Sequence, residues 1–159
     1  MKVPAGHEPA RDDPARHEPA PHDPEPPAAD AGSSGPAWAG FWGAVLVGLG
    51  VAVGALGTHF LVGRIPVARE ATLAAAVRYQ FVSGIGLLLI AALAKSPATG
   101  RSAWFRGAAV ALLLGAVLFC GSLYVLIAGG PNAMGAVAPL GGAGMIAGWT
   151  LLAVALSRR

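Results

Sequence analysis

The sequence predicts an all-α protein, an integral membrane four-helix bundle in up-and-down order that follows a disordered N-terminal tail. Hydrophobic residues make up 55% of the chain and charged residues 12%, outside the usual range of soluble domains. Residues 107 to 157, fifty-one in a row, carry no charge at all. The apolar runs are about 20 residues long, enough for a helix to cross the hydrocarbon core, whereas a membrane β-strand needs about ten residues of alternating polarity.

Residues 1–36 form the tail, for which we expect no fixed structure. Nine of the 13 prolines and seven of the eight acidic residues lie here. Such a segment cannot bury enough apolar surface to offset the entropy lost on ordering. Its histidines stand beside carboxylates, but metal coordination needs a fixed geometry. We therefore expect a solvated tether and no metal site.

Residues 37–159 are expected to form the membrane domain. Trp38 and Trp42 open its first apolar run and Trp104 its third, as expected of rings that settle at headgroup level. Pro66 suits the start of a helix, and residues 129–132 (Gly-Gly-Pro-Asn) suit a turn. The predicted transmembrane helices cover about 37–62, 72–93, 104–128 and 136–156. Because 36 polar residues precede the first run, we expect an uncleaved anchor rather than a signal peptide.

An even number of spans places both termini on one side of the membrane. The bases expected on that side are Lys95, Arg101, Arg106, Arg158 and Arg159, together with three more distant bases in the tail. Those expected on the other side are Arg64, Arg69 and Arg78. The positive-inside rule then favours cytoplasmic termini. We predict a multi-pass protein of the plasma (inner) membrane.

Small residues recur at the spacing that lets membrane helices approach closely. Lipid offers no hydrophobic drive for helices to associate, so close backbone packing has to supply the attraction. The glycines expected at helix contacts are Gly50, Gly54, Gly107, Gly115, Gly144 and Gly148.

Polar residues of the predicted spans gather at one end of such a bundle. The candidate polar cluster comprises His59, Arg78, Tyr79, Gln80, Ser83, Ser122 and Tyr124, with Asn132 in the nearby turn. A charge at the membrane centre costs about 2.5–3.5 kcal/mol, so Arg78 is a candidate functional residue with Tyr79, Tyr124, Ser122 and helix-end carbonyls as expected partners. The simpler alternatives are that Arg78 snorkels to the interface and that Ser122 and Tyr124 only join helices.

Enzyme signatures are missing from the sequence. His59 is the sole histidine outside the tail, and no aspartate there could orient it as a base. Cys120 is the sole cysteine, and together with His59 it supplies too few ligands for a metal site. The simpler interpretation of Cys120 is a small apolar side chain that fills space between helices. The bases stand at the ends of apolar runs rather than in a patch, which argues against nucleic acid binding. We predict no catalytic residue, no metal and no cofactor.

Four blocks of sequence carry a resemblance to a known family. They are Gly54-Ala55-Leu56-Gly57-Thr58-His59; Arg78-Tyr79-Gln80; Leu118-Phe119-Cys120-Gly121-Ser122-Leu123-Tyr124; and Pro139-Leu140-Gly141-Gly142 with Ala147-Gly148-Trp149. In order and spacing they resemble the YgdD/YwdK-like family of small bacterial inner-membrane proteins, the domain of unknown function 423 group, over about residues 40–156. The resemblance implies four membrane helices and a polar cluster at one membrane face, and no activity. The chain departs from the family pattern at Thr58, where alanine is usual, and at Ser83, where a second histidine is usual.

The function expected from these features is binding. We expect a non-enzymatic membrane protein that binds or supports a partner, with the lipid bilayer around it and a membrane protein or a second copy as possible partners. The alternative is a small transporter or channel component acting as an oligomer. In that alternative His59, Arg78, Tyr79 and Ser122 line a polar path that reaches only partway through the bilayer.

Overall fold

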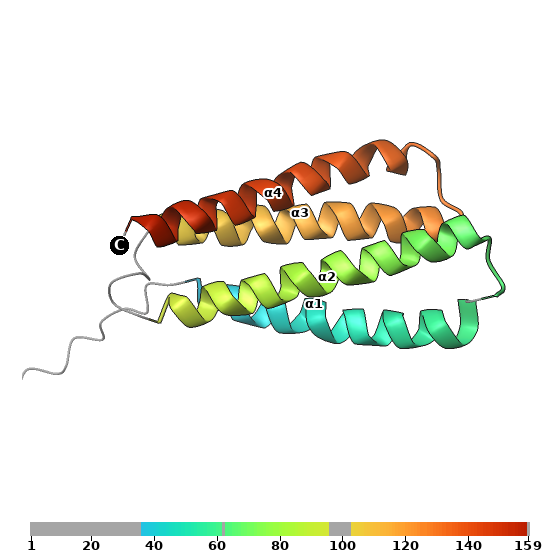
Figure 1. The fold of residues 1–159 in the computed structure, drawn as a ribbon, viewed down its shortest axis with the longest axis horizontal. Coiled ribbons are helices and arrows are strands. Elements are labelled where there is room, and N and C mark those ends of the chain that lie inside the picture. Colours follow the sequence, from blue (N-terminus) through green and yellow to red (C-terminus); the bar gives the residue numbers. More distant parts are fainter. Residues whose placement is uncertain (1–35, 62, 96–102, 159) are drawn as a thin grey trace, which may run out of the picture. The chain divides into compact units, whose positions relative to one another are not determined.

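The computed structural model describes residues 36–61, 63–95 and 103–158. Within these ranges the chain forms the long helices α1 (Ala37–Leu56), α2 (Val67–Leu93), α3 (Ala103–Ile127) and α4 (Met134–Ser157), and no strand (Figure 1). All four are long and apolar enough to cross a bilayer, which confirms the predicted all-α membrane bundle. The predicted tail lies outside the described residues except for Pro36.

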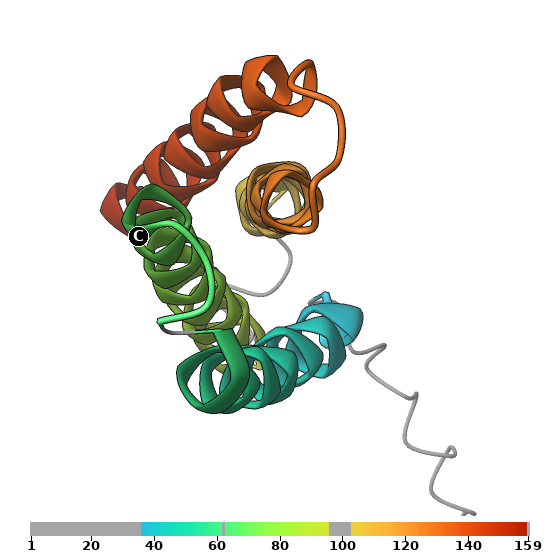
Figure 2. The same cartoon turned by 90° about the vertical axis from the view of Figure 1, so that its right-hand side faces the viewer.

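The helices are arranged as two antiparallel hairpins. Helix α1 packs on α2, α3 packs on α4, and the hairpins meet where α2 contacts α3. Figure 2 shows α1 and α4 well apart, with α2 between them. Both short turns lie at one end of the bundle, and α1 begins at the end where α4 finishes (Figure 1).

The turns follow from their glycines and prolines. Gly63 and Gly129 have φ angles of 77° and 86°, in the left-handed region that glycine adopts without strain. The Gly130 N–H donates to the Val125 carbonyl at 2.8 Å and so closes the end of α3. Helix α2 begins directly after Pro66, about five residues before the expected start of the second span, and so includes Glu70 in its first turn.

Helix α1 ends irregularly. Its last turn widens into a π-helical segment, η1 (Gly57–Leu61), which contains Thr58 and His59. The Thr58 hydroxyl donates to the Gly54 carbonyl at 2.9 Å. π-Helical turns are rare and often stand at functional sites, so the end of α1 is a natural place to search for one.

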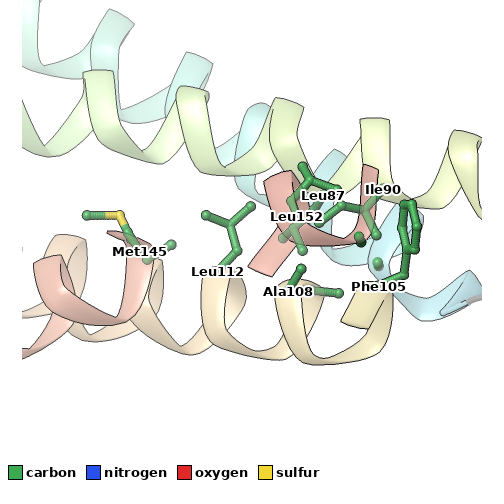
Figure 3. Packing of buried hydrophobic residues seen from close by; sticks show 11 residues of the cluster. Leu87, Ile90, Phe105, Ala108, Leu112, Met145 and Leu152 are labelled. Atoms are coloured by element: carbon green, nitrogen blue, oxygen red, sulfur yellow. The ribbon is translucent and has the colours of Figure 1, made fainter. Parts of the chain in front are cut away.

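The buried core lies in the half of the bundle where α1 begins and α4 ends. Leu87 and Ile90 of α2 meet Phe105 and Leu112 of α3 and Leu152 of α4 (Figure 3). Helix α2 is the most enclosed, yet only 44% of its most apolar window is buried. Most apolar side chains therefore face outward, as expected where lipid is the solvent.

Glycines allow the closest helix contacts. A Cβ built on Gly115 of α3 would lie 2.5 Å from the Met145 nitrogen of α4, and one built on Gly148 would lie 2.8 Å from the Leu112 nitrogen. Gly144 is half-buried and also lies close to α3, with 3.0 Å from such a Cβ to the Gly115 Cα. The predicted Gly50, Gly54 and Gly107 meet only side chains, at 3.4 to 3.6 Å.

The closest backbone approach between α1 and α2 involves glycines that the sequence did not single out. A Cβ on Gly43 would lie 2.8 Å from the Gly84 carbonyl oxygen, and one on Gly84 would lie 3.0 Å from the Gly43 oxygen. Both hairpins therefore have a backbone contact that any side chain would disturb.

Candidate functional site

Gln80 is the centre of the buried part of the candidate cluster. Its side chain is 3% exposed and sits on the inner face of α2. The amide nitrogen donates to the Leu46 carbonyl of α1 at 2.8 Å, and the amide oxygen accepts from the Tyr124 hydroxyl of α3 at 2.5 Å. One side chain thus joins three helices by hydrogen bonds on both sides of its amide.

Two further polar side chains lie beside Gln80 and are also engaged. The Ser83 hydroxyl, fully buried, donates to the Met145 sulfur of α4 at 3.3 Å. The Cys120 thiol of α3 donates to the Ala76 carbonyl of α2 at 3.4 Å. Together with Gln80 these groups connect all four helices just beyond the apolar core.

Ser122 takes no part in these contacts between helices. Its hydroxyl is buried but donates to the Phe119 carbonyl of its own helix at 2.8 Å. Such a bond from a serine to the preceding turn satisfies the hydroxyl within α3 and leaves it without a cross-helix role.

The remaining cluster residues point outward. Tyr79 is 45% exposed, and its ring packs edge-to-face on Phe119 with centroids 5.2 Å apart. The side chains of Arg78 and His59 are exposed, and neither side chain makes a hydrogen bond or an ion pair with any residue that the structure describes. The expected partners of Arg78 are engaged elsewhere, because Tyr124 bonds Gln80 and Ser122 bonds its own helix.

The division has a simple geometric cause. Successive residues of an α-helix are about 100° apart around the axis, so Arg78 and Gln80 differ by about 200° and face opposite ways. Gln80 lies toward α1 and α3, and Arg78 consequently lies on the outward face of α2. The seven candidates are therefore a buried hydrogen-bonded group and a separate exposed group.

Glu70 is the residue that the sequence reasoning passed over. It is the single acidic residue after the tail, and its position in the first turn of a helix was the available signal. One carboxylate oxygen, Oε1, accepts from the Gly63 N–H at 2.7 Å and so fixes the turn between η1 and α2.

A groove opens beside Glu70, between the end of α1 and the start of α2. Its volume is about 200 Å³, and its walls include Gly54, Thr58, Glu70, Leu73, Ala74 and Val77. Gly54 and Ala74 keep the groove open, because larger side chains at these positions would fill it. The groove is apolar apart from the carboxylate and the threonine hydroxyl.

Reactive groups are sparse in this part of the protein. Across residues 36–61, 63–95 and 103–158, no three His, Cys, Asp or Glu side chains stand together as metal ligands would. Every buried side-chain nitrogen and oxygen in the same ranges has a hydrogen-bond partner. The buried polar side chains are suited to holding the helices together, and the exposed ones are suited to contacting the surrounding bilayer.

Comparison with known proteins places the chain among small membrane proteins. Residues 53–142 match the model of a family described as protein of unknown function (DUF423). The chain is 35% identical to the UPF0382 membrane protein YwdK of Bacillus subtilis over 71% of its own length and 90% of that protein. It is 35% identical to the UPF0382 inner membrane protein YgdD of Escherichia coli K12 over 68% of its own length and 80% of that protein. No solved structure matches the chain. On both grounds the chain belongs to the DUF423 family of membrane proteins of unknown function.

Proposed function

We propose that this protein is a non-enzymatic component of the plasma membrane that binds another constituent of the bilayer through the outward face of α2. The proposal rests on one observation, that the Arg78 side chain is exposed and unpaired among the described residues. Its guanidinium is exposed on a helix that crosses the membrane, and no described residue pairs with it. A charge within the hydrocarbon region is unfavourable, by about 2.5–3.5 kcal/mol at its centre. A partner outside the described residues would stabilise Arg78, because those residues offer none.

The buried polar residues support binding over catalysis. Catalysis by a hydroxyl or thiol needs a neighbouring base, and Ser83, Ser122 and Cys120 instead donate to a thioether or to backbone carbonyls. Their hydrogen bonds hold the helices in register. The fixed helices then leave Arg78 and Tyr79 exposed on α2.

The apolar core argues against a pore through a single bundle. Beyond Gln80 and Ser83, the side chains of Leu87, Ile90 and Leu112 are fully buried and pack against one another. Water and ions do not pass such an apolar layer without an opening. Transport through this fold would need several copies around a shared path.

The proposal is tested by photo-crosslinking from the α2 face. Val82 lies one turn from Arg78 and is 43% exposed, so a photoreactive residue in its place reports what contacts that face. The matched control is Val117 of α3, which is 53% exposed. We expect a defined adduct from position 82 that weakens in an Arg78→Gln background, and only scattered adducts from position 117.

Transport is examined in liposomes with the same variant. Flux that the unaltered protein supports and Arg78→Gln abolishes would replace the binding proposal with the transport alternative. Equal adducts from positions 82 and 117 would also overturn it, because the α2 face would then be ordinary lipid-facing surface.

A further inference from the structure

The groove between η1 and α2 contains an anionic group with free bonding capacity. Oε1 of Glu70 is bound by the Gly63 N–H, and Oε2 has no partner among the described residues. Every buried side-chain oxygen in those residues has a partner, so the unpartnered Oε2 is not buried, and Glu70 is one of the residues that line the groove. A ligand entering the groove therefore meets a carboxylate oxygen that can accept hydrogen bonds.

Thr58 adds a second acceptor to the groove. Its hydroxyl hydrogen is used in the bond to the Gly54 carbonyl, so the oxygen can only accept from a ligand. Glu70 and Thr58 together favour a group with several N–H donors. A primary ammonium, with three donors and a positive charge, meets both requirements.

A positive charge lies farther along the same helix. Arg78 follows Glu70 by eight residues, about 12 Å along the axis of α2, and therefore lies deeper in the bilayer. The Cα–Cβ bonds of a helix tilt toward its N-terminus, so the Arg78 side chain is able to reach back toward Glu70. The positions that precede Arg78 by three and four residues are Ala75 and Ala74, short enough to leave that route open. Ala74 also lines the groove.

We propose that this groove binds a phospholipid with a primary amine in its headgroup, of the phosphatidylethanolamine class. The ammonium contacts Glu70 and Thr58, the phosphate contacts Arg78, and an acyl chain lies against Val77 and Gly54. The order of charges along α2 is the order in the lipid, where the phosphate lies deeper than the terminal amine. This inference rests on the proposed function, because it names the bilayer constituent that the α2 face binds.

The charges discriminate between headgroups. A choline headgroup has a quaternary nitrogen and no N–H to donate to Glu70 or Thr58. A glycerol headgroup satisfies Arg78 through its phosphate but brings no positive charge to the carboxylate. The hydroxyls of a glycerol headgroup can donate hydrogen bonds to Glu70 and Thr58, but only an amine headgroup also neutralises the carboxylate.

The test is native mass spectrometry of the full chain in mild detergent, titrated with phosphatidylethanolamine, phosphatidylcholine or phosphatidylglycerol of identical acyl chains. We expect phosphatidylethanolamine to bind about tenfold more tightly than phosphatidylcholine, the ratio that one charge-assisted hydrogen bond supplies. Glu70→Gln keeps an acceptor for the Gly63 N–H and should abolish the preference. Arg78→Gln should weaken the binding of all three lipids.

Two further variants control the result. Ala74→Leu fills the groove without altering a charge and should reduce phosphatidylethanolamine binding as much as Glu70→Gln does. Arg106→Gln, at an exposed position at the opposite end of the bundle, should change nothing. Melting temperatures of all variants exclude unfolding as the cause.

The contradicting outcomes are distinct from those of the proposed function. Equal affinity for phosphatidylethanolamine and phosphatidylcholine, a preference for phosphatidylglycerol, or a preference that survives Glu70→Gln overturns the amine site. If position 82 still gives an Arg78-dependent adduct, and that adduct is a protein, the proposed function stands while the lipid assignment fails.

Discussion

Replacing Gly115 with alanine should separate α3 from α4. A Cβ at this position would lie 2.5 Å from the Met145 nitrogen, 2.8 Å from the Gly144 carbonyl carbon and 2.9 Å from the Gly141 oxygen. All three are backbone atoms and cannot turn away as a side chain can. Ordinary contact begins near 3.4 Å, so α4 has to move outward by about 1 Å.

The expected cost follows from that displacement. Overpacking by one methyl group in a tight interface costs about 1–3 kcal/mol. An opposing gain of about 1 kcal/mol comes from the higher helix propensity of alanine. Gly121→Ala in the same helix shares that gain, and its Cβ would meet nothing within 4 Å. The difference between the two variants therefore isolates the packing cost, which we expect to be about 1–3 kcal/mol.

The assay is reversible unfolding in mixed micelles of mild and denaturing detergent, followed by circular dichroism. Gly115→Ala should unfold at a lower denaturant fraction than the unaltered protein, and Gly121→Ala at an equal or higher fraction. Equal stabilities for Gly115→Ala and Gly121→Ala would refute the close contact between α3 and α4.

Two other predictions concern polar contacts. Gln80→Leu breaks the bonds to Leu46 and Tyr124, and a double-mutant cycle with Tyr124→Phe in the unfolding assay should give a coupling of about 0.5–2 kcal/mol; zero coupling would mean that the 2.5 Å contact contributes nothing. Arg158→Gln removes a guanidinium that stands 4.7 Å from the Trp104 ring centroid, and we expect a loss of at most about 1 kcal/mol together with altered tryptophan emission. An unchanged spectrum would contradict that stacking.

Hydropathy was sufficient to predict the fold class. Runs of about 20 apolar residues can only be helices in lipid, because every backbone N–H and C=O must be bonded within the segment. The turn at residues 129–132 followed from its glycines and proline. The start of α2 differed from the expected start of the span, since the helix continues past the apolar run to Pro66. Hydropathy marks only the part of a helix inside the hydrocarbon core, and α2 extends beyond that part through Arg69 and Glu70.

The inward faces of the helices were harder to predict. In a soluble protein an apolar stripe marks the buried face, but these helices are apolar all round and lipid covers the outside. Gly43 and Gly84 were missed for this reason, because many glycines fit a small-residue pattern and only the helix pairing selects among them.

For the candidate cluster, the sequence predicts part of which residues face inward and which face outward. Arg78 and Gln80 are two positions apart, so they cannot share a helix face, and their separation followed from the sequence alone. That Gln80 is the inward residue did not, because it depends on Leu46 and Tyr124 of other helices. The groove at Glu70 depends likewise on the widened turn η1, which no local sequence pattern predicted.

The depth of Arg78 in the bilayer, and with it the proposed function, depends on all four helices crossing the membrane. Reporter fusions at Gly130 and at the C-terminus test this most directly, because Gly130 lies in the turn between α3 and α4. Four crossings place the two reporters on opposite sides, and the positive-inside rule predicts the C-terminal one in the cytoplasm. Reporters on the same side would contradict the four-span arrangement from which the position of Arg78 inside the bilayer is inferred.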